Sequence, residues 1–588
     1  MSKAYSIQRS KILSSNGGVG STMETIDNIS LQILPFNRWN LYGQIGRGSQ
    51  RHLLFGESRL LARLRSLGFD SLNQFFQLDD FSDVENIYRL DNGQRLRVVN
   101  SDLFPRWLYC PGCGRFMDIA DWRRVWNAKF TDRQLDSVPR CPYEANRSDR
   151  KIMAKNKLVQ VRFVLVSMET GNIRDIPWKE VFDMKAKAKY PGIWEMDSTT
   201  QSCDEVFYHF KGGSELHRIG VKNQSKEFIS LAEIMGHWFV IEEEGQKVAY
   251  RPIVRTSNNV YYSYNLNSVY IPKIEINNDI VDDIRVYHCE DGWSVDRIKR
   301  EFDRHRKPLT KLEIQSIIDN GFQVPNGFSY ATEEDFRLDE FEYLTDLARY
   351  RDGVYREDER LTSIHYPYNQ HRIVNIFYQK QLCVTTVQVA YSRIDKIGLS
   401  NLGNWEGRND PPKKWLDVND YSESEGVNVK LRPICENFNQ VSYMPALQSF
   451  GEGFLVELDL SDIAEADREV YLHTFCHILM KELEFSCGYP LASLCERLYF
   501  LPTKNKYGFM IYAVGGSTGS YGGITSLFYS EKINDIIDRA IQRAKDCPND
   551  PICEAEHGHC FACVDIPETA CEQFNTKLSR KVFNRIIV

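Results

Sequence analysis

The sequence has 588 residues, of which 42% are hydrophobic and 26% are charged, and its 73 Lys and Arg against 80 Asp and Glu give a formal net charge of −7. These are ordinary globular values, so they exclude a disordered chain and a uniformly basic, nucleic-acid-coating chain. The length is too great for one hydrophobic core and predicts about two to four domains.

The sequence contains no run that approaches the ~18 consecutive apolar residues of a membrane span. Its start, MSKAYSIQRSKILSSNGGVG, lacks the apolar middle of a signal peptide. We therefore expect a cytoplasmic protein without a membrane partner. In a reducing compartment clustered cysteines are interpreted as metal ligands and scattered ones as small core residues. The scattered ones are Cys289, Cys383, Cys435, Cys476, Cys487 and Cys495.

Local patterns predict the first elements in chain order. Residues 57–69 have the apolar spacing of a helix that ends at Gly68. The run LVQVRFVLV, residues 158–166, predicts a buried strand. The stretch SNNVYYSYNLNSVYIP, residues 257–272, alternates like a β ribbon at an exposed edge, and residues 301–314 favour a helix.

The C-terminal part gives the clearest pattern. Residues 469–483 predict an amphipathic helix, and residues 507–514 predict a strand. The turn GGSTGSYGG, residues 515–523, follows, and a second helix then leads to Cys547. The inner stripe of the first helix comprises Leu472, Phe475, Cys476, Leu479 and Leu483, and that of the second comprises Ile533, Ile537, Ala540, Ile541 and Ala544.

Together these elements predict an α+β, multi-domain mixed fold. We expect a helical and turn region at 1–106 and a degenerate zinc-ribbon-like module at 107–160. A central, aromatic-rich α/β region would follow at 161–460, and a zinc-braced C-terminal α/β domain at 461–588.

The C-terminal cysteines have the spacing of a zinc site. Cys560 and Cys563 form a Cys-x-x-Cys pair, which supplies two thiolates from one tight turn. Cys571 and either Cys553 or Cys547 would close the site. The weaker substitutes are His557 and His559, and the other readings are thiols without metal or a redox site. Four protein ligands leave no position for water, so the predicted zinc is structural.

The N-terminal module has an incomplete ligand set. Cys110 and Cys113 form a first knuckle, and Cys141 begins a second one in which Glu144 stands where a fourth cysteine would be. A carboxylate is a less common ligand in a structural zinc site. A second zinc site and a decayed ribbon held by packing are both open here.

Candidates for catalysis are weak. His473 and His477 have the spacing of a metalloprotease helix, but Thr474 replaces the glutamate that would act as general base. A buried or interface histidine pair is the simpler interpretation. The glycine-rich turn at 515–523 lacks the lysine of a phosphate-binding loop, so we expect a close-packed turn. No motor or hydrolase motif was found, and we predict a protein that is not an enzyme.

Several motifs together resemble one family, the DrmB proteins of the bacterial DISARM anti-phage system. They include RSKILSSNGGVGSTM, LFPRWLYCPGCGRF, VQVRFVLVSMETGNIRDIPW and QSFGEGFLVELD, with Glu452 at the centre of its Gly-Glu-Gly. The C-terminal set is LHTFCHILMKELEFSCGYPLASLCERLY, MIYAVGGSTGSYGGITSL, HCFACVDIPETACEQFN and LSRKV. The chain departs from the family at Ser167 and at Gly171–Asn172, where the family tends to show a cysteine and a Gly-His pair.

The resemblance implies a non-catalytic accessory subunit with a helicase-associated C-terminal domain. Such a subunit would bind a DrmA-like helicase ATPase and help it to engage phage DNA. One alternative is a free-standing protein that binds single-stranded nucleic acid by stacking bases on Tyr261, Tyr262 and Tyr264. Another is a metal-dependent hydrolase centred on the two histidines. The tail residues Arg580, Lys581 and Arg585 are candidates for phosphate contact or for a solvated face.

Overall fold

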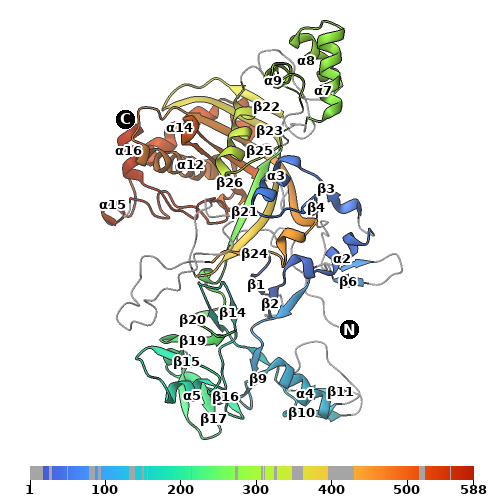
Figure 1. Ribbon diagram of the computed structural model, residues 1–588. Helices are drawn as coiled ribbons and strands as arrows, with labels where there is room; N and C mark the ends of the chain where they lie inside the picture. The colour runs from blue at the N-terminus through green and yellow to red at the C-terminus, as the bar shows by residue number, and fades with distance from the viewer. Residues whose placement is uncertain are drawn as a thin grey trace. The chain divides into compact units, whose positions relative to one another are not determined.

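The structure is a computed structural model, and it places the chain in two compact units, each built from separate stretches (Figure 1). Unit 1 comprises Met1–Leu53, Leu78–Asn265 and Gln388–Phe438, and unit 2 comprises Leu54–Gln77, Leu266–Val387 and Asn439–Val588. This division differs from the four consecutive segments expected from the sequence. The residues described are 17–24, 29–48, 51–77, 87–89, 95–97, 99–130, 140–148, 151–154, 156–213, 215–271, 276–305, 309, 311–323, 328–346, 362–394, 430–514, 523–556 and 558–587.

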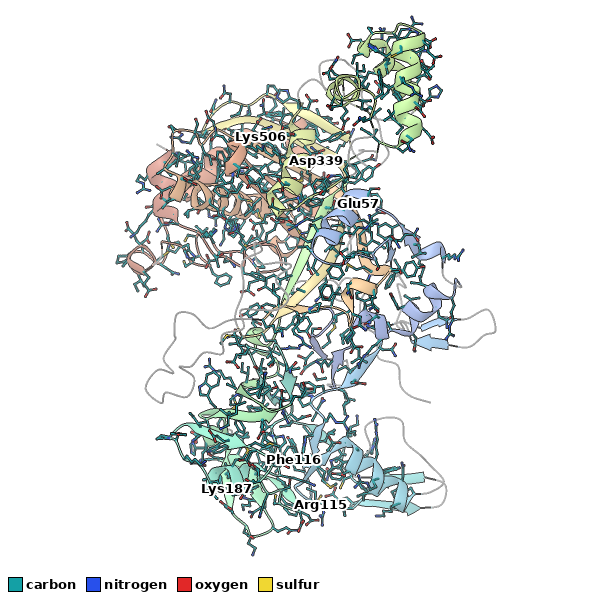
Figure 2. The ribbon with its side chains drawn as sticks, in the orientation of Figure 1. Glu57, Arg115, Phe116, Lys187, Asp339 and Lys506 are labelled. Carbon is teal, nitrogen blue, oxygen red and sulfur yellow. The ribbon has the colours of Figure 1, made fainter. Side chains whose placement is uncertain are left out.

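Unit 1 is dominated by two sheets. In the described part of the unit, one sheet has the order β12 (Val159–Gln160), β8 (Trp107–Tyr109), β9 (Arg115–Asp118), β16 (Val206–Phe210), β17 (Ile219–Asn223) and β18 (Phe228–Ser230). The other has the order β14 (Ile173–Arg174), β13 (Phe163–Val166), β20 (Gln246–Val254), β19 (Trp238–Glu243) and β15 (Ile193–Met196). Their side chains form one core around Phe116, which Figure 2 labels, and Trp178.

Smaller elements complete unit 1. The strands β1 (Thr22–Glu24), β2 (Ser30–Ile33) and β7 (Ser101–Leu103) form a sheet, and β5 (Ile87–Arg89) with β6 (Arg95–Arg97) and β10 (Ala145–Ser148) with β11 (Lys151–Ala154) form hairpins. The helices are α2 (Asn40–Gly46), α4 (Ile119–Lys129), α5 (Val181–Ala186) and α6 (Leu231–Met235). Asp118 caps α4, because its Oδ1 accepts a hydrogen bond from the Ala120 amide at 2.7 Å.

One long sheet lies mainly in unit 2, and residues 262–265 and 388–392 of its strands fall in unit 1. Its strand order is β21 (Tyr262–Val269), β23 (Ile373–Ser392), β25 (Tyr443–Leu458), β27 (Lys506–Val514) and β26 (Leu494–Leu501). The strand β22 (Thr362–Tyr366) pairs with β23, β4 (Gln74–Gln77) runs parallel to β25, and β3 (Leu54–Phe55) pairs with β4. Segments hundreds of residues apart thus share one sheet.

Helices pack on this sheet. The long helix α12 (Glu465–Cys487) contacts β26, β27, α14 (Lys532–Arg543) and α16 (Arg580–Ile587), and these helices lie together in the orange and red part of Figure 1. The unit also contains α3 (Ser58–Ser66), α10 (Glu333–Thr345), α13 (Gly523–Tyr529) and α15 (Ile552–Glu556). Three further helices share a separate small core: α7 (Asn278–Arg285), α8 (Val295–Arg304) and α9 (Lys311–Asp319).

The structure confirms most of the local predictions. The fold is a mixture of α and β structure in more than one unit. The helix expected at 57–69 is α3, the one at 469–483 lies within α12, and the second C-terminal helix is α14. The strand expected at 507–514 is β27. The charged stretch 301–314 contains the end of α8 and the start of α9, whereas residues 515–522 of the glycine-rich turn lie outside the described residues.

Two strand predictions were wrong in part. Residues 158–166 form two short strands, β12 and β13, which belong to different sheets, because the chain leaves one sheet at Val161 and enters the next at Phe163. The ribbon at 257–272 forms an edge strand, β21, but its side chains are mostly buried rather than exposed. In the described part of the chain, no helix has the length and apolarity that crossing a membrane requires.

Candidate metal centres

Four cysteine sulfurs of unit 2 converge on one point. Cys547 follows α14, Cys553 lies on α15, and Cys560 and Cys563 lie on one tight turn. The Sγ atoms of Cys547 and Cys560 are 3.6 Å apart, those of Cys553 and Cys563 are 3.7 Å apart, and those of Cys560 and Cys563 are 3.8 Å apart. A zinc ion with Zn–S bonds of about 2.3 Å in a tetrahedron gives S···S edges of ~3.8 Å. The sulfurs therefore fit zinc.

The local backbone explains this convergence. The amides of Cys563, Val564 and Asp565 all donate to the carbonyl oxygen of Cys560, which closes the knuckle turn. The side-chain amide of Asn549 donates to Cys560 Sγ at 3.4 Å, and its backbone amide donates to Cys547 Sγ at 3.4 Å. Such N–H donors stabilise thiolates, the form of cysteine that binds zinc.

The thiols of this group differ in acidity. Burial opposes ionisation of Cys560, but the Ala562 amide, the Cys547 thiol and the Asn549 amide lower its pKa to about 7. Burial raises the pKa of Cys553 to about 11 and also raises that of Cys563. Cys560 therefore ionises before Cys553 and Cys563, and a bound cation would be needed to hold those two as thiolates.

The ligand set differs from the predicted one at one position. Cys547 and Cys553 were alternatives in the prediction, but both belong to the group, whereas Cys571 lies apart from it. Cys571 instead lies beside α12, where its Sγ is 3.4 Å from His473 Nε2. Of the weaker substitutes, His559 pairs with Asp565 at 2.7 Å and His557 lies outside the described residues.

The N-terminal module brings three cysteines together. Cys110, Cys113 and Cys141 form one group, in which the Sγ atoms of Cys113 and Cys141 are 3.7 Å apart. The Gly114 amide donates to the Cys110 carbonyl and closes the knuckle. Burial raises the pKa of Cys110 to about 12 and raises that of Cys141. The three sulfurs fit a zinc site that needs a further ligand.

Glu144, the expected fourth ligand, is not part of this three-sulfur group. Its Oε2 accepts a hydrogen bond from the Asn156 side chain at 2.6 Å, and its carboxylate lies so close over Gly112 that a side chain there would collide with it. Among the residues that the structure describes, no further His, Cys, Asp or Glu joins the three sulfurs.

His473 and His477 lie side by side on α12 and are completely buried. Their Nε2 atoms face Glu496 of β26, and that of His473 also faces Cys571. Burial lowers the pKa of His477, so its imidazole is neutral near pH 7. Sequence reasoning missed Glu496, and the only signal for it was a carboxylate within the apolar run of a strand.

Other residues singled out from the sequence have structural roles. Arg580 is buried, and its guanidinium donates to both oxygens of Asp550 at 2.7 Å, so it is not available for phosphate. Arg585 pairs with Asp467 at 2.6 Å, whereas Lys581 is exposed. Glu452 accepts hydrogen bonds from the amides of Ile524 and Thr525 and thereby caps the start of α13.

The tyrosines proposed to stack on bases are buried in unit 1. Tyr261, Tyr262 and Tyr264 have 9%, 8% and 1% of their surface exposed. The hydroxyl of Tyr261 donates to the Val19 carbonyl at 3.0 Å, and that of Tyr264 lies 3.1 Å from Ser392 Oγ. These rings cannot serve as a stacking platform, so the single-strand-binding alternative loses the feature that suggested it.

Comparisons with known proteins extend over most of the chain. Residues 8–262 match a family described as a domain of unknown function, DUF8724. The chain is 24% identical over 552 residues to the DISARM protein DrmB of Bacillus paralicheniformis (strain ATCC 9945a / NCIMB 11709 / CD-2), an alignment that covers 82% of this chain and 88% of that protein. The resemblance expected from the motifs is confirmed.

A solved structure gives a weaker match. The crystal structure of the DUF1998 helicase MrfA bound to DNA aligns with a TM-score of 0.22 and 13% sequence identity. The alignment covers 39% of this chain and 24% of the helicase chain, so the chain spans about a quarter of that helicase. This overlap is too small for a comparison of folds.

Proposed function

We propose, from the premise that the chain is a DrmB-like protein, that it is a non-catalytic accessory subunit of a bacterial anti-phage defence complex. The observation that carries this proposal is the similarity to the DISARM protein DrmB over 82% of this chain and 88% of that protein. In the complex the chain would bind a DrmA-like helicase ATPase in the cytoplasm and help it to engage phage DNA.

The chemistry of the sites supports a role without catalysis. The four sulfurs of the C-terminal group supply a full tetrahedral set, which leaves no position for water or substrate. His473 and His477 are enclosed by Glu496 and Cys571, all of them buried, so the arrangement offers no access to a substrate. The burial of the three tyrosines removes the sequence feature that favoured a free-standing single-strand-binding protein.

The turn at Cys560 and the short helix α15 also carry exposed apolar side chains suited to contact with a partner. Phe561, between two ligand cysteines, is 72% exposed, and Ile552, next to Cys553, is 67% exposed. Zinc would fix the position of both, because each adjoins a ligand in sequence. We assign the contact with the helicase to these two segments, since a large apolar side chain on an ordered segment gains by burial against a partner.

Co-purification tests the proposal. The chain is co-expressed with a DrmA-like helicase ATPase, and the mixture is run on a sizing column at micromolar concentration. We expect one shared peak, and ATP hydrolysis only in fractions that contain the ATPase. Two separate peaks, or ATP turnover by this chain alone, would contradict the proposal.

A pair of variants then locates the contact. Phe561→Ser is expected to raise the protein concentration at which the shared peak forms by at least tenfold. Tyr529→Ser is the matched control, because Tyr529 is similarly exposed at 64% but lies on α13, away from the cysteine turns in sequence. Equal co-purification of both variants would place the contact elsewhere on the chain.

A further inference from the structure

A second group of potential ligands lies in the core of unit 2, separate from the four cysteines. It consists of His473 and His477 on α12, Glu496 on β26 and Cys571. One ligand atom from each of the four residues lies within 4.8 Å of the others. The exposed fractions are 0% for both histidines, 1% for Glu496 and 7% for Cys571, so water does not solvate these groups.

The contacts of His477 leave two acceptors facing each other. Its Nδ1 lies 3.2 Å from the carbonyl oxygen of Val564, and because a carbonyl only accepts, Nδ1 carries the hydrogen. In the neutral ring Nε2 is then a bare lone pair, and it lies 3.0 Å from Glu496 Oε2. Neither atom has a hydrogen-bond partner among the described residues. With the ring neutral, the two atoms need a positive charge between them, which a proton or a metal ion supplies.

His473 and Cys571 complete the group. His473 Nε2 lies 3.1 Å from Glu496 Oε1 and 3.4 Å from Cys571 Sγ, and Nδ1 of this ring has no hydrogen-bond partner within the described residues. The sulfur accepts hydrogen bonds from the backbone amides of Asn575 at 3.2 Å and Gln573 at 3.4 Å. Two such donors suit a thiolate.

The outer contacts of the group are those of a metal site. The Val564 carbonyl fixes the tautomer of His477, and the Glu572 amide donates to Glu496 Oε1 at 2.8 Å, which orients the carboxylate. Metal-ligating histidines in proteins are held in the same way by a carbonyl on the other ring nitrogen.

We propose that His473, His477, Glu496 and Cys571 form a second, closed zinc site. The charge balances, because one thiolate and one carboxylate neutralise a divalent cation that two neutral imidazoles also bind. Four protein ligands leave no open position, so the ion ties α12 to β26 and to the segment that carries Cys571 and does not hydrolyse a substrate. Val564, whose carbonyl contacts His477, directly follows Cys563 in the sequence. The proposed site is therefore linked through one residue to a ligand of the four-cysteine group.

The ligand type of bound zinc tests the proposal without disturbing the site. The full chain carries Cys110→Ser and Cys113→Ser, so that the N-terminal group does not contribute. We expect about two zinc equivalents, and an X-ray absorption spectrum with both Zn–S distances of about 2.3 Å and Zn–N/O distances of about 2.0–2.1 Å. About one equivalent with sulfur ligands alone would overturn the second site.

Variants of the chain that carries Cys110→Ser and Cys113→Ser show which residues bind each zinc equivalent. His477→Gln is expected to remove one equivalent and the nitrogen signal, and Cys560→Ser should remove the equivalent that has only sulfur ligands. His365→Gln is the matched control, because His365 of β22 hydrogen-bonds to Asn375 outside the group. Two equivalents with unchanged spectra in His477→Gln would refute the site. Should His477→Gln fail to fold, the spectrum of the parent chain decides.

Discussion

Glu57 is a single buried side chain from which we expect a pH dependence of the stability of unit 2. The residue is 9% exposed and is labelled in Figure 2. Its Oε1 accepts a hydrogen bond from Ser268 Oγ at 2.5 Å, whereas Oε2 has no hydrogen-bond partner in the described part of the chain. Burial is the main cause that raises the pKa of Glu57 to about 7. The carboxyl is therefore protonated in the folded protein at mildly acidic pH.

We predict that Glu57→Gln flattens the pH dependence of stability. The folded pKa is above the unfolded one, so the folded state holds the proton more tightly, and stability falls as pH rises from about 4.5 to about 7. Gln cannot ionise, so the variant should be more stable than the wild type at pH 8, by up to about 3 kcal/mol, and should show no gain at pH 4.5. Urea unfolding at both pH values measures this, and parallel profiles would contradict it.

At the scale of an element, α12 is the centre of unit 2. Its first turn carries Glu465 and Asp467, whose negative charges interact favourably with the positive N-terminal end of the helix dipole. Gly488 ends the helix with a positive φ of 73°. The helix is buried on several sides because β26, β27, α14 and α16 all pack against it. The ring of Phe475 is fully buried against Phe509 and Phe583.

Phe475→Ala should lower the free energy of unfolding of unit 2 by about 3–5 kcal/mol, because it removes a large ring and leaves a cavity. Glu465→Ala on the exposed first turn is the control and should change it by less than ~0.5 kcal/mol. Urea unfolding followed by far-UV circular dichroism compares the two. A similar loss in both variants would mean that the packing of α12 does not set the stability.

At the scale of the whole molecule, the two units have separate cores. Trp178 is completely buried in the core of unit 1 and packs against Phe116 at 5.0 Å between ring centroids. Phe475 belongs to the main core of unit 2. Among the tryptophans of the described residues, all except Trp293 fall in the stretches of unit 1, so tryptophan fluorescence is expected to report mainly on unit 1.

We expect two unfolding transitions, because each unit has a core of its own. Trp178→Ala should move the midpoint seen by fluorescence and leave the other transition in place. Phe475→Ala should shift the transition of unit 2, which circular dichroism detects, and should leave the fluorescence midpoint unchanged. One transition that both variants shift equally would show that the units unfold together.

The sequence alone determined the features that depend on neighbours along the chain. The apolar period of residues 469–483 predicted α12, because one face of a helix repeats every 3.6 residues. The Cys-x-x-Cys pairs at Cys110 and Cys560 predicted the knuckles, because two thiolates three residues apart come from one tight turn. The order and spacing of several short motifs indicated the DrmB resemblance, which the comparison with the relative confirms.

Only the tertiary structure decided which distant segments meet. It placed Cys547 with Cys553, moved Cys571 to the histidines of α12, and brought in Glu496 from a strand that no motif marked. It also buried Tyr261 and its neighbours, which an alternating pattern had placed at an exposed edge. The physical reason is that periodicity fixes which face of an element is apolar, whereas the path of the chain fixes what that face packs against.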